Sequence, residues 1–229
     1  MGVGGANKGA ETLDQLLGGI DDRSRPLLTY YDMSTGERVE LSGTTTANWV
    51  AKTSNFLVDE LDADTMSRIR IGVPTHWLRF VWILSAWSVG AAVVDSGADI
   101  GLSGPELEAD ERHRVAASLR PLGGRFASPP QGFLDLGAEV QGHGDHFFAS
   151  DPPTPQTLAI EVDGVRRTHA ELLTIAGNAD RIAVEPGTIE RDAQLIAAAC
   201  LGGGSLVAVT SATPTDLARV AEQEGAEIA

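Results

Sequence analysis

Basic residues are scarce in this sequence of 229 residues. Lysine and arginine together number 17 against 32 aspartates and glutamates, so the formal net charge is -15 at pH 7. So acidic a chain is repelled by the phosphates of nucleic acids and by anionic membrane surfaces, which argues against both as partners. The charge also disfavours nucleotides, unless a local basic or amide-lined site overrides it. Hydrophobic residues still make up 42% of the chain, which excludes a disordered protein and allows a large core.

Cysteine and long hydrophobic runs are lacking as well. The single cysteine, Cys200, rules out an internal disulfide and is typical of a cytoplasmic protein. The longest apolar stretch, residues 80–94, contains Ser85 and Ser88 and is too short to span a bilayer. No basic segment followed by an apolar core stands at the N-terminus, so no signal peptide is predicted. We therefore expect a cytoplasmic protein without a membrane partner.

The most informative stretch, residues 67–95, has the pattern of a strand, a helix and a second strand. Apolar and polar residues alternate over 68–73, as in a strand. Thr75 is then placed to cap a helix over 77–89 that is apolar on nearly every side, which indicates a buried helix. The apolar run 91–94 is typical of a strand that is buried on both faces. The unit is therefore a βαβ crossover around which the fold is built.

The rest of the chain continues this alternation. We predict helices over residues 11–17, 44–61, 105–119, 168–178, 189–201 and 215–224, strands over 99–102, 158–162, 181–184 and 206–209, and a hairpin over 26–41. Such alternation predicts a layered α/β fold with a mostly parallel sheet and helices on both faces. We expect a flexible segment with a short helix over 1–24 and one α/β domain over 25–229. A glycine- and proline-rich linker is predicted inside that domain, over 141–156.

The order of these pieces resembles a known family. Five segments carry the likeness: residues 28–61, Arg68-Ile-Arg-Ile-Gly-Val-Pro, Trp87-Ser-Val-Gly-Ala-Ala-Val-Val, Gly164-Val-Arg-Arg-Thr-His-Ala-Glu-Leu-Leu and Leu201-Gly-Gly-Gly-Ser-Leu-Val-Ala-Val. Together they resemble the N-terminal half of the adenylate-forming superfamily, the AMP-binding acyl-CoA synthetases and their relatives. More narrowly, the chain resembles a family of short bacterial proteins that keep only this N-terminal part. The resemblance implies their α/β fold.

One departure from the superfamily pattern bears on function. The resemblance implies a Ser/Thr/Gly-rich loop ending in Pro-Lys-Gly just before Gly164, where backbone amides and a lysine would cradle phosphates. Here residues 158–162 lead directly into Asp163, which stands in the place of that lysine, so attraction to phosphate becomes repulsion. The superfamily's adenine-binding and metal-binding motifs and its C-terminal domain would follow beyond the last residue of this sequence. No motif of the sequence therefore supports ATP with magnesium or CoA as a cofactor, and we predict no catalytic residues.

Five residues are candidates for a ligand cleft: His76, Asp163, Gly164, Thr168 and His169. His76 follows a strand and opens a helix, which places it at the carboxyl edge where open α/β sheets bind ligands. His169 has two interpretations. It could contact a ligand at that edge, or Thr168 could cap a helix and leave His169 on the surface, and we favour the second.

Other suggestive residues have structural explanations. His143, Asp145 and His146 resemble a metal cluster but lie in a Gly/Pro loop without a second ligand group, so a solvated loop is expected and no metal. Residues 202–204 are all glycine, yet they follow a helix and precede a strand, which predicts a helix stop rather than a phosphate loop. Cys200 ends an apolar helix and is predicted to be a buried, inert thiol. The sequence has no Gly-x-Ser-x-Gly elbow, so a hydrolase is not supported.

Three functional hypotheses follow. The first is a catalytically degenerate relative that serves as a binding module, with an acyl or CoA-like small molecule as the ligand class the resemblance implies, or with a protein partner. The second is a split acyl-adenylating enzyme that a partner chain completes. The third is a homodimeric structural protein, in which a second copy covers the apolar helix over residues 77–89.

Overall fold

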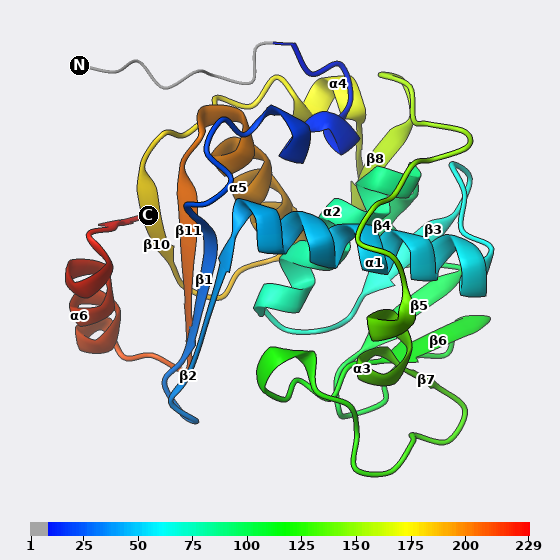
Figure 1. Ribbon diagram of the computed structural model, residues 1–229, viewed down its shortest axis with the longest axis horizontal. Coiled ribbons are helices and arrows are strands. Elements are labelled where there is room, and N and C mark those ends of the chain that lie inside the picture. The colour runs from blue at the N-terminus through cyan, green and yellow to red at the C-terminus, as the bar shows by residue number, and fades with distance from the viewer. Residues whose placement is uncertain (1–8) are drawn as a thin grey trace.

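The computed structural model describes residues 9–229, which form two sheets with helices between them (Figure 1). The five-stranded sheet has the order β12-β10-β11-β1-β2. Its strands are β1 (Pro26–Asp32), β2 (Glu37–Ser42), β10 (Arg181–Val184), β11 (Ser205–Thr210) and β12 (Glu227–Ile228). Only the β1–β2 hairpin is antiparallel in this sheet, as the predicted hairpin over 26–41 requires.

The seven-stranded sheet has the order β7-β6-β5-β3-β4-β8-β9. Its strands are β3 (Arg68–Ile71), β4 (Ala92–Val94), β5 (Ile100–Ser103), β6 (His113–Ala116), β7 (Leu134–Asp135), β8 (Leu158–Val162) and β9 (Val165–Thr168). All of these pairings are parallel except β8–β9. The mostly parallel α/β fold is thus confirmed, but the strands are divided between two sheets where we predicted one.

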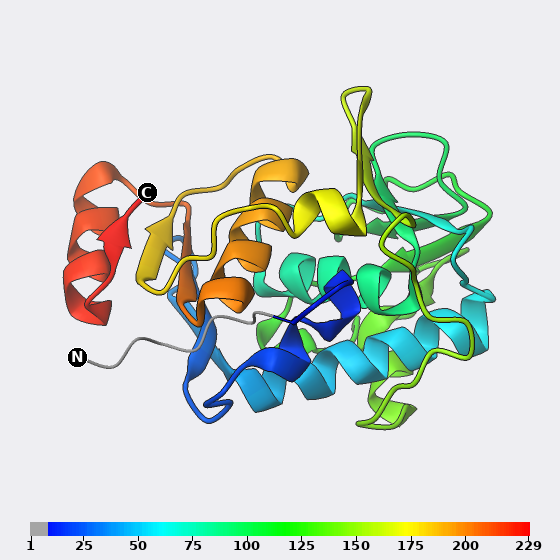
Figure 2. The same cartoon turned by 90° about the horizontal axis from the view of Figure 1, so that it is seen from above.

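Helices pack between the two sheets, and a further helix lies outside the five-stranded sheet (Figure 1). The helices are α1 (Gly43–Leu61), α2 (Trp77–Val89), α3 (Leu136–Glu139), α4 (His169–Leu172), α5 (Ile189–Gly202) and α6 (Pro214–Glu224). Short 3-10 turns occupy Leu13–Gln15, Leu17–Gly19, Pro121–Gly123 and Val140–Gly142. Helix α6 packs on the outer face of the five-stranded sheet (Figure 2), where Leu217 and Val220 form a small second core with Val207 and Val209. The order of layers is therefore α6, five-stranded sheet, inner helices, seven-stranded sheet.

Helix α2 is the centre of the main core. Every residue of it except Arg79 and Ser88 is buried. It touches β1 of one sheet and β3 and β4 of the other, together with α1 and α5. The apolar sides of the predicted βαβ unit are thus covered by the same chain. The homodimer hypothesis relied on a second copy to cover this apolar helix, and the chain itself covers it. Dimerisation stays an untested prediction.

The predicted helix over 105–119 is wrong. Leu107 and Leu119 both have left-handed backbones, with φ of 58° and 52°, which a helix does not tolerate. Between them, Val115 lies in β6, fully buried and paired in parallel with Leu102 of β5. The acidic residues of this stretch lie in the loop before β6, where the carboxylate of Glu111 pairs with the guanidinium of Arg70.

Two helix ends also differ from the predictions. Helix α2 is capped by His76 and not by Thr75, since the imidazole accepts the Leu78 N–H. The helix predicted over 168–178 ends at Leu172, because the chain turns back there to pack against the end of α5. At that contact the Asn178 N–H donates to the Ala198 carbonyl at 2.8 Å.

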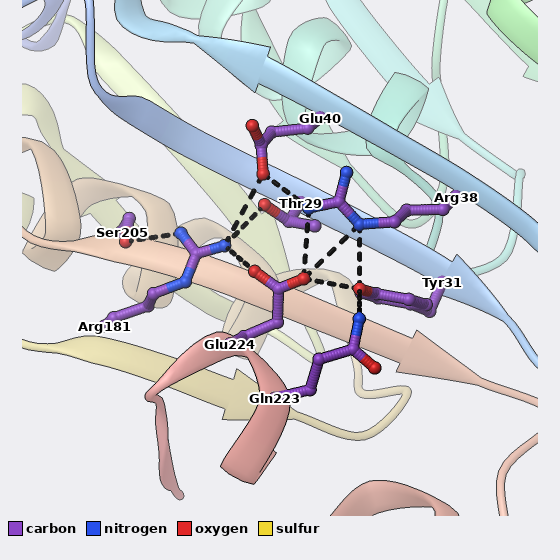
Figure 3. A network of polar contacts seen from close by, with 8 residues as sticks. All are labelled: Thr29, Tyr31, Arg38, Glu40, Arg181, Ser205, Gln223 and Glu224. Carbon is purple, nitrogen blue, oxygen red and sulfur yellow. Dashed lines mark hydrogen bonds and ion pairs between the residues drawn. The ribbon is translucent and has the colours of Figure 1, made fainter. Parts of the chain in front are cut away.

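A polar network joins α6 to the five-stranded sheet (Figure 3). The Glu224 carboxylate, at the end of α6, accepts hydrogen bonds from the Tyr31 hydroxyl, from Arg38 at 3.0 Å and from Arg181 at 2.5 Å. Burial alone would raise the pKa of Glu224, but these three donors outweigh it and lower the pKa to about 2. The ionised carboxylate is therefore the form that holds α6 in place.

We expect Glu224→Gln to destabilise the protein at neutral pH and to do so less in acid. The pKa of the folded-state carboxyl lies below its ordinary value of 4.5, so the stabilisation is present above that value and disappears as the pH falls from about 4.5 to about 2. The shift corresponds to a loss on the order of 3 kcal/mol in the free energy of unfolding at pH 7. Chemical denaturation of both proteins across this pH range measures it, with Glu222→Gln, exposed on the same helix, as control. A difference that does not change with pH would contradict the assignment.

Candidate functional site

A cleft of about 620 Å³ opens where strands of both sheets end. Asp32 is the last residue of β1, and Thr210 is the last residue of β11. Pro186 follows β10, and the segment of residues 74–76 follows β3. The carboxyl ends of parallel strands are where open α/β folds bind ligands. The cleft is therefore the candidate site of this chain.

His76 is a buried polar group in the wall of the cleft. Its side chain is 2% exposed and its ring meets the Tyr30 ring edge-on, with centroids 4.5 Å apart. Its Nδ1 accepts the Leu78 N–H at 3.2 Å. Burial lowers the pKa of His76 to about 4, although the Asp32 carboxylate acts in the opposite direction. The imidazole is thus neutral at pH 7 with its proton on Nε2, and that N–H has no acceptor among residues 9–229.

Two carboxylates in the cleft have different surroundings. Asp32 accepts hydrogen bonds from the backbone and hydroxyl of Ser34, at 2.9 and 2.8 Å, and from the Thr35 hydroxyl at 3.0 Å. Burial would raise the pKa of Asp32, but these donors lower it. Glu37 is paired with Asp32 across the hairpin, and its pKa is raised by burial and by the Asp32 charge. Its buried Oε1 has no donor in the described part of the chain.

A buried ion pair holds the β3–α2 turn in position. Arg79 of α2 donates to Asp192 of α5 at 2.7 Å, and the Thr75 hydroxyl donates to the same carboxylate oxygen at 2.9 Å. The Gly187 N–H, after β10, donates to that hydroxyl at 3.1 Å. The pair therefore ties the turn carrying His76 to the end of β10, which fixes the shape of the cleft.

Asp163 and Gly164 form the two-residue turn of the β8–β9 hairpin, which projects from the body of the protein (Figure 2). Both residues have left-handed backbones, with φ of 52° and 74°, as tight hairpin turns require. The Asp163 N–H donates to the Asp95 carboxylate, after β4, at 2.7 Å. A tight turn beside two carboxylates stands where the resemblance implies a phosphate loop.

Thr168 and His169 lie at the other end of β9, beside the amino end of β8, where the His169 N–H donates to the Thr157 carbonyl at 3.0 Å. Thr168 caps α4 as predicted, in a capping box with Glu171. The predicted surface position of His169 is wrong, because its side chain is fully buried and its Nδ1 accepts the Leu13 N–H at 3.1 Å. Burial lowers the pKa of His169 to about 4. The histidine thus anchors the segment before β1.

Of the five candidate residues, the structure brings only His76 to the cleft. Asp163 and Gly164 lie two strands away along the same edge of the seven-stranded sheet, and Thr168 and His169 lie at its opposite edge. The polar residues of the β1–β2 turn were not among the predicted site residues, because the pattern over 26–41 indicated only a hairpin. Its position at the carboxyl end of a strand was a signal that could have identified them.

The residues dismissed as a metal cluster pair with residues of α1. Lys52 binds Asp145 at 3.0 Å and the His143 carbonyl at 2.6 Å, and Asn55 binds the His146 carbonyl at 2.9 Å. No group of three metal-binding side chains occurs between residues 9 and 229. Cys200 is buried as predicted, and burial raises the pKa of its thiol to about 12. In the same range, no helix is long and apolar enough to cross a membrane.

The chain is similar to a protein from Mycobacterium tuberculosis (strain ATCC 25618 / H37Rv) that is described as a TIGR03089 family protein. The two are 35% identical over 210 residues, which cover 85% of this chain and 86% of that protein. No protein-family model matches the chain.

Solved structures of acyl-CoA synthetases share the fold. The acyl-CoA synthetase of Brucella canis superimposes with a TM-score of 0.78 at 15% identity, over 95% of this chain and 46% of that one. The N-terminal domain of FACL13 from Mycobacterium tuberculosis superimposes with a TM-score of 0.71 at 14% identity, over 94% of this chain and 61% of that one. The chain therefore has the fold of the N-terminal part of acyl-CoA synthetases and spans about half the length of the first.

Proposed function

Because this chain belongs to the TIGR03089 family and has the fold of the N-terminal part of acyl-CoA synthetases, we propose that it is a binding module that does not adenylate acyl groups. The Asp163–Gly164 turn is the observation that carries the proposal. A two-residue turn offers no row of backbone amides to bind phosphate oxygens. The carboxylates of Asp163 and Asp95 lie at this turn, and their negative charge repels the phosphates of a nucleotide.

The cleft beside His76 supports small-molecule binding as the function that is kept. It is large enough for a small ligand, and two of the residues that line it each carry a buried polar atom, His76 Nε2 and Glu37 Oε1, that has no partner in residues 9–229. Buried polar groups without partners are costly in a folded protein. A ligand that completes their hydrogen bonds offsets that cost, so the cleft is proposed as the binding site.

We expect ATP with magnesium to leave the melting temperature of the protein unchanged at concentrations that saturate acyl-CoA synthetases. A ligand that binds only the folded state stabilises it by about 2.7 kcal/mol at one hundred times its dissociation constant, so real binding would be visible in a thermal-shift assay. Calorimetric titration with ATP, AMP and CoA measures the same property directly. A full-length acyl-CoA synthetase, treated identically, is the positive control.

Magnesium-dependent ATP binding at micromolar affinity would overturn the proposal. It would favour the alternative of a split acyl-adenylating enzyme, which requires a partner chain that supplies the rest of the nucleotide site. Co-purification of a stable complex with such a chain would be the corresponding result.

A further inference from the structure

We infer that the cleft beside His76 binds a small molecule with a positively charged amine and a neighbouring hydrogen-bond acceptor. The inference rests on the proposed function, because it assigns a ligand class to the same cleft. It also replaces the acyl or CoA-like anion that the family resemblance implies with a ligand of opposite charge.

The charges around the cleft favour a cation over an anion. Asp32 and Glu37 line it together with a single basic residue, Arg120. The Arg120 guanidinium is directed to the Arg125 carbonyl at 3.5 Å, and the whole chain adds a net charge of -15. A carboxylate or a phosphate entering this cleft is repelled, whereas an ammonium group is attracted.

The two carboxylates differ in how many of their hydrogen bonds are already made within the chain. Asp32 is already supplied with donors by Ser34 and Thr35. Glu37 has a buried oxygen, Oε1, that receives no donor from the residues described. An ammonium group offers three N–H donors and a charge, and a charge-assisted hydrogen bond is among the strongest that a site can form. Glu37 is therefore the group that holds the amine.

His76 adds an independent requirement. Its side chain is 2% exposed, it lines the cleft, and its Nε2–H is a donor without an acceptor in residues 9–229. The matching ligand atom is a carbonyl or hydroxyl oxygen. The Tyr30 ring, Leu119 and Pro121 supply apolar surface, which suits a ligand with a hydrophobic body between its polar groups.

Three probes that share one body test the charge preference. L-Phenylalaninamide is a cation, N-acetyl-L-phenylalaninamide is neutral, and N-acetyl-L-phenylalanine is an anion, and all three contain a carbonyl acceptor and an aromatic ring. We expect the cation to bind at least roughly tenfold more tightly than the anion, a difference of about 1.4 kcal/mol. Protein-observed NMR titration at millimolar probe measures the affinities. The resonances of His76 and of the β1–β2 turn should shift.

Two charge-neutralising variants complete the experiment. Glu37→Gln keeps the shape of the side chain and removes its charge, and we expect the affinity for the cation to fall roughly tenfold. Glu222→Gln removes one charge from the exposed face of α6 and should leave the affinity unchanged. Comparison of the two separates a local contact with Glu37 from a general effect of net charge.

The inference is overturned if the anion binds as tightly as the cation, if no probe binds, if the shifted resonances lie away from the cleft, or if Glu37→Gln binds the cation like the wild type. None of these results would restore ATP binding, so the proposed absence of adenylation would stand. Conversely, ATP binding at the β8–β9 hairpin would overturn the proposed function, whichever probe the cleft prefers.

Discussion

Gly202→Ala is expected to lower the free energy of unfolding by about 3 kcal/mol or more. A Cβ atom on Gly202 would lie under 3.0 Å from the backbone of Asn178, a distance that real side chains essentially never show. Because the obstacle is backbone and not the end of a flexible side chain, the loop of residues 177–180 must move away from α5. The Asn178 N–H would then lose its bond to the Ala198 carbonyl. Chemical denaturation measures the loss.

Gly203→Ala is the matched control, one residue further along. Gly203 ends α5 with φ of 76°, but no atom lies within 4 Å of the Cβ it would gain. The substitution therefore costs only the left-handed backbone conformation, about 1 to 2 kcal/mol. Equal losses for the two variants would contradict the view that Gly202 is required by close approach of two backbones.

Asp192→Ala should be equally damaging, at about 3 to 5 kcal/mol of unfolding free energy. Asp192 is fully buried and pairs with Arg79, whose side chain is 12% exposed. Removal of the carboxylate leaves a guanidinium in the core without its counter-charge, and it frees the Thr75 hydroxyl that positions the turn before His76. We expect the variant to lose stability and to bind ligands in the cleft more weakly.

The double variant Arg79→Met with Asp192→Leu separates charge from packing. Replacing both members of a buried ion pair by apolar residues often restores stability, so the double variant should recover much of what Asp192→Ala loses. Thermal and chemical unfolding of all three proteins measure the recovery. A double variant less stable than Asp192→Ala would show that hydrogen bonds, and not an unpaired charge, dominate at this position.

The fold was predictable where the pattern is local. The alternation over residues 68–73 and the apolar helix after it gave β3 and α2, because burial on every side leaves few polar positions. Ser42, Thr168 and Thr213 cap helices as their side chains favour. The division of the strands into two sheets was not predictable, since it depends on which strands meet across the core.

The site was harder to predict, because its residues meet only in the folded chain. Asp163 was identified from a departure in a motif, and the structure explains it as a hairpin turn. The burial of His169 depends on a contact with Leu13, from which it is 156 positions distant, and no local pattern reports such a contact. Glu37 belongs to no recognised motif. Its unpaired oxygen identifies it as a candidate ligand contact only because the residue lines the cleft of the folded chain.

The pairing of β1 with β11 dictates when the protein can finish folding. Tyr30 and Thr210, which share a hydrogen bond, are 180 positions apart, whereas residues 68–168 contain every strand of the seven-stranded sheet. During synthesis that sheet can form as soon as its own segment has emerged. The β1–β2 hairpin is synthesised first, and the free edge of β1 stays unpaired until residues 205–210 have been synthesised. The hairpin is therefore the part of the nascent chain most exposed to incorrect strand pairing.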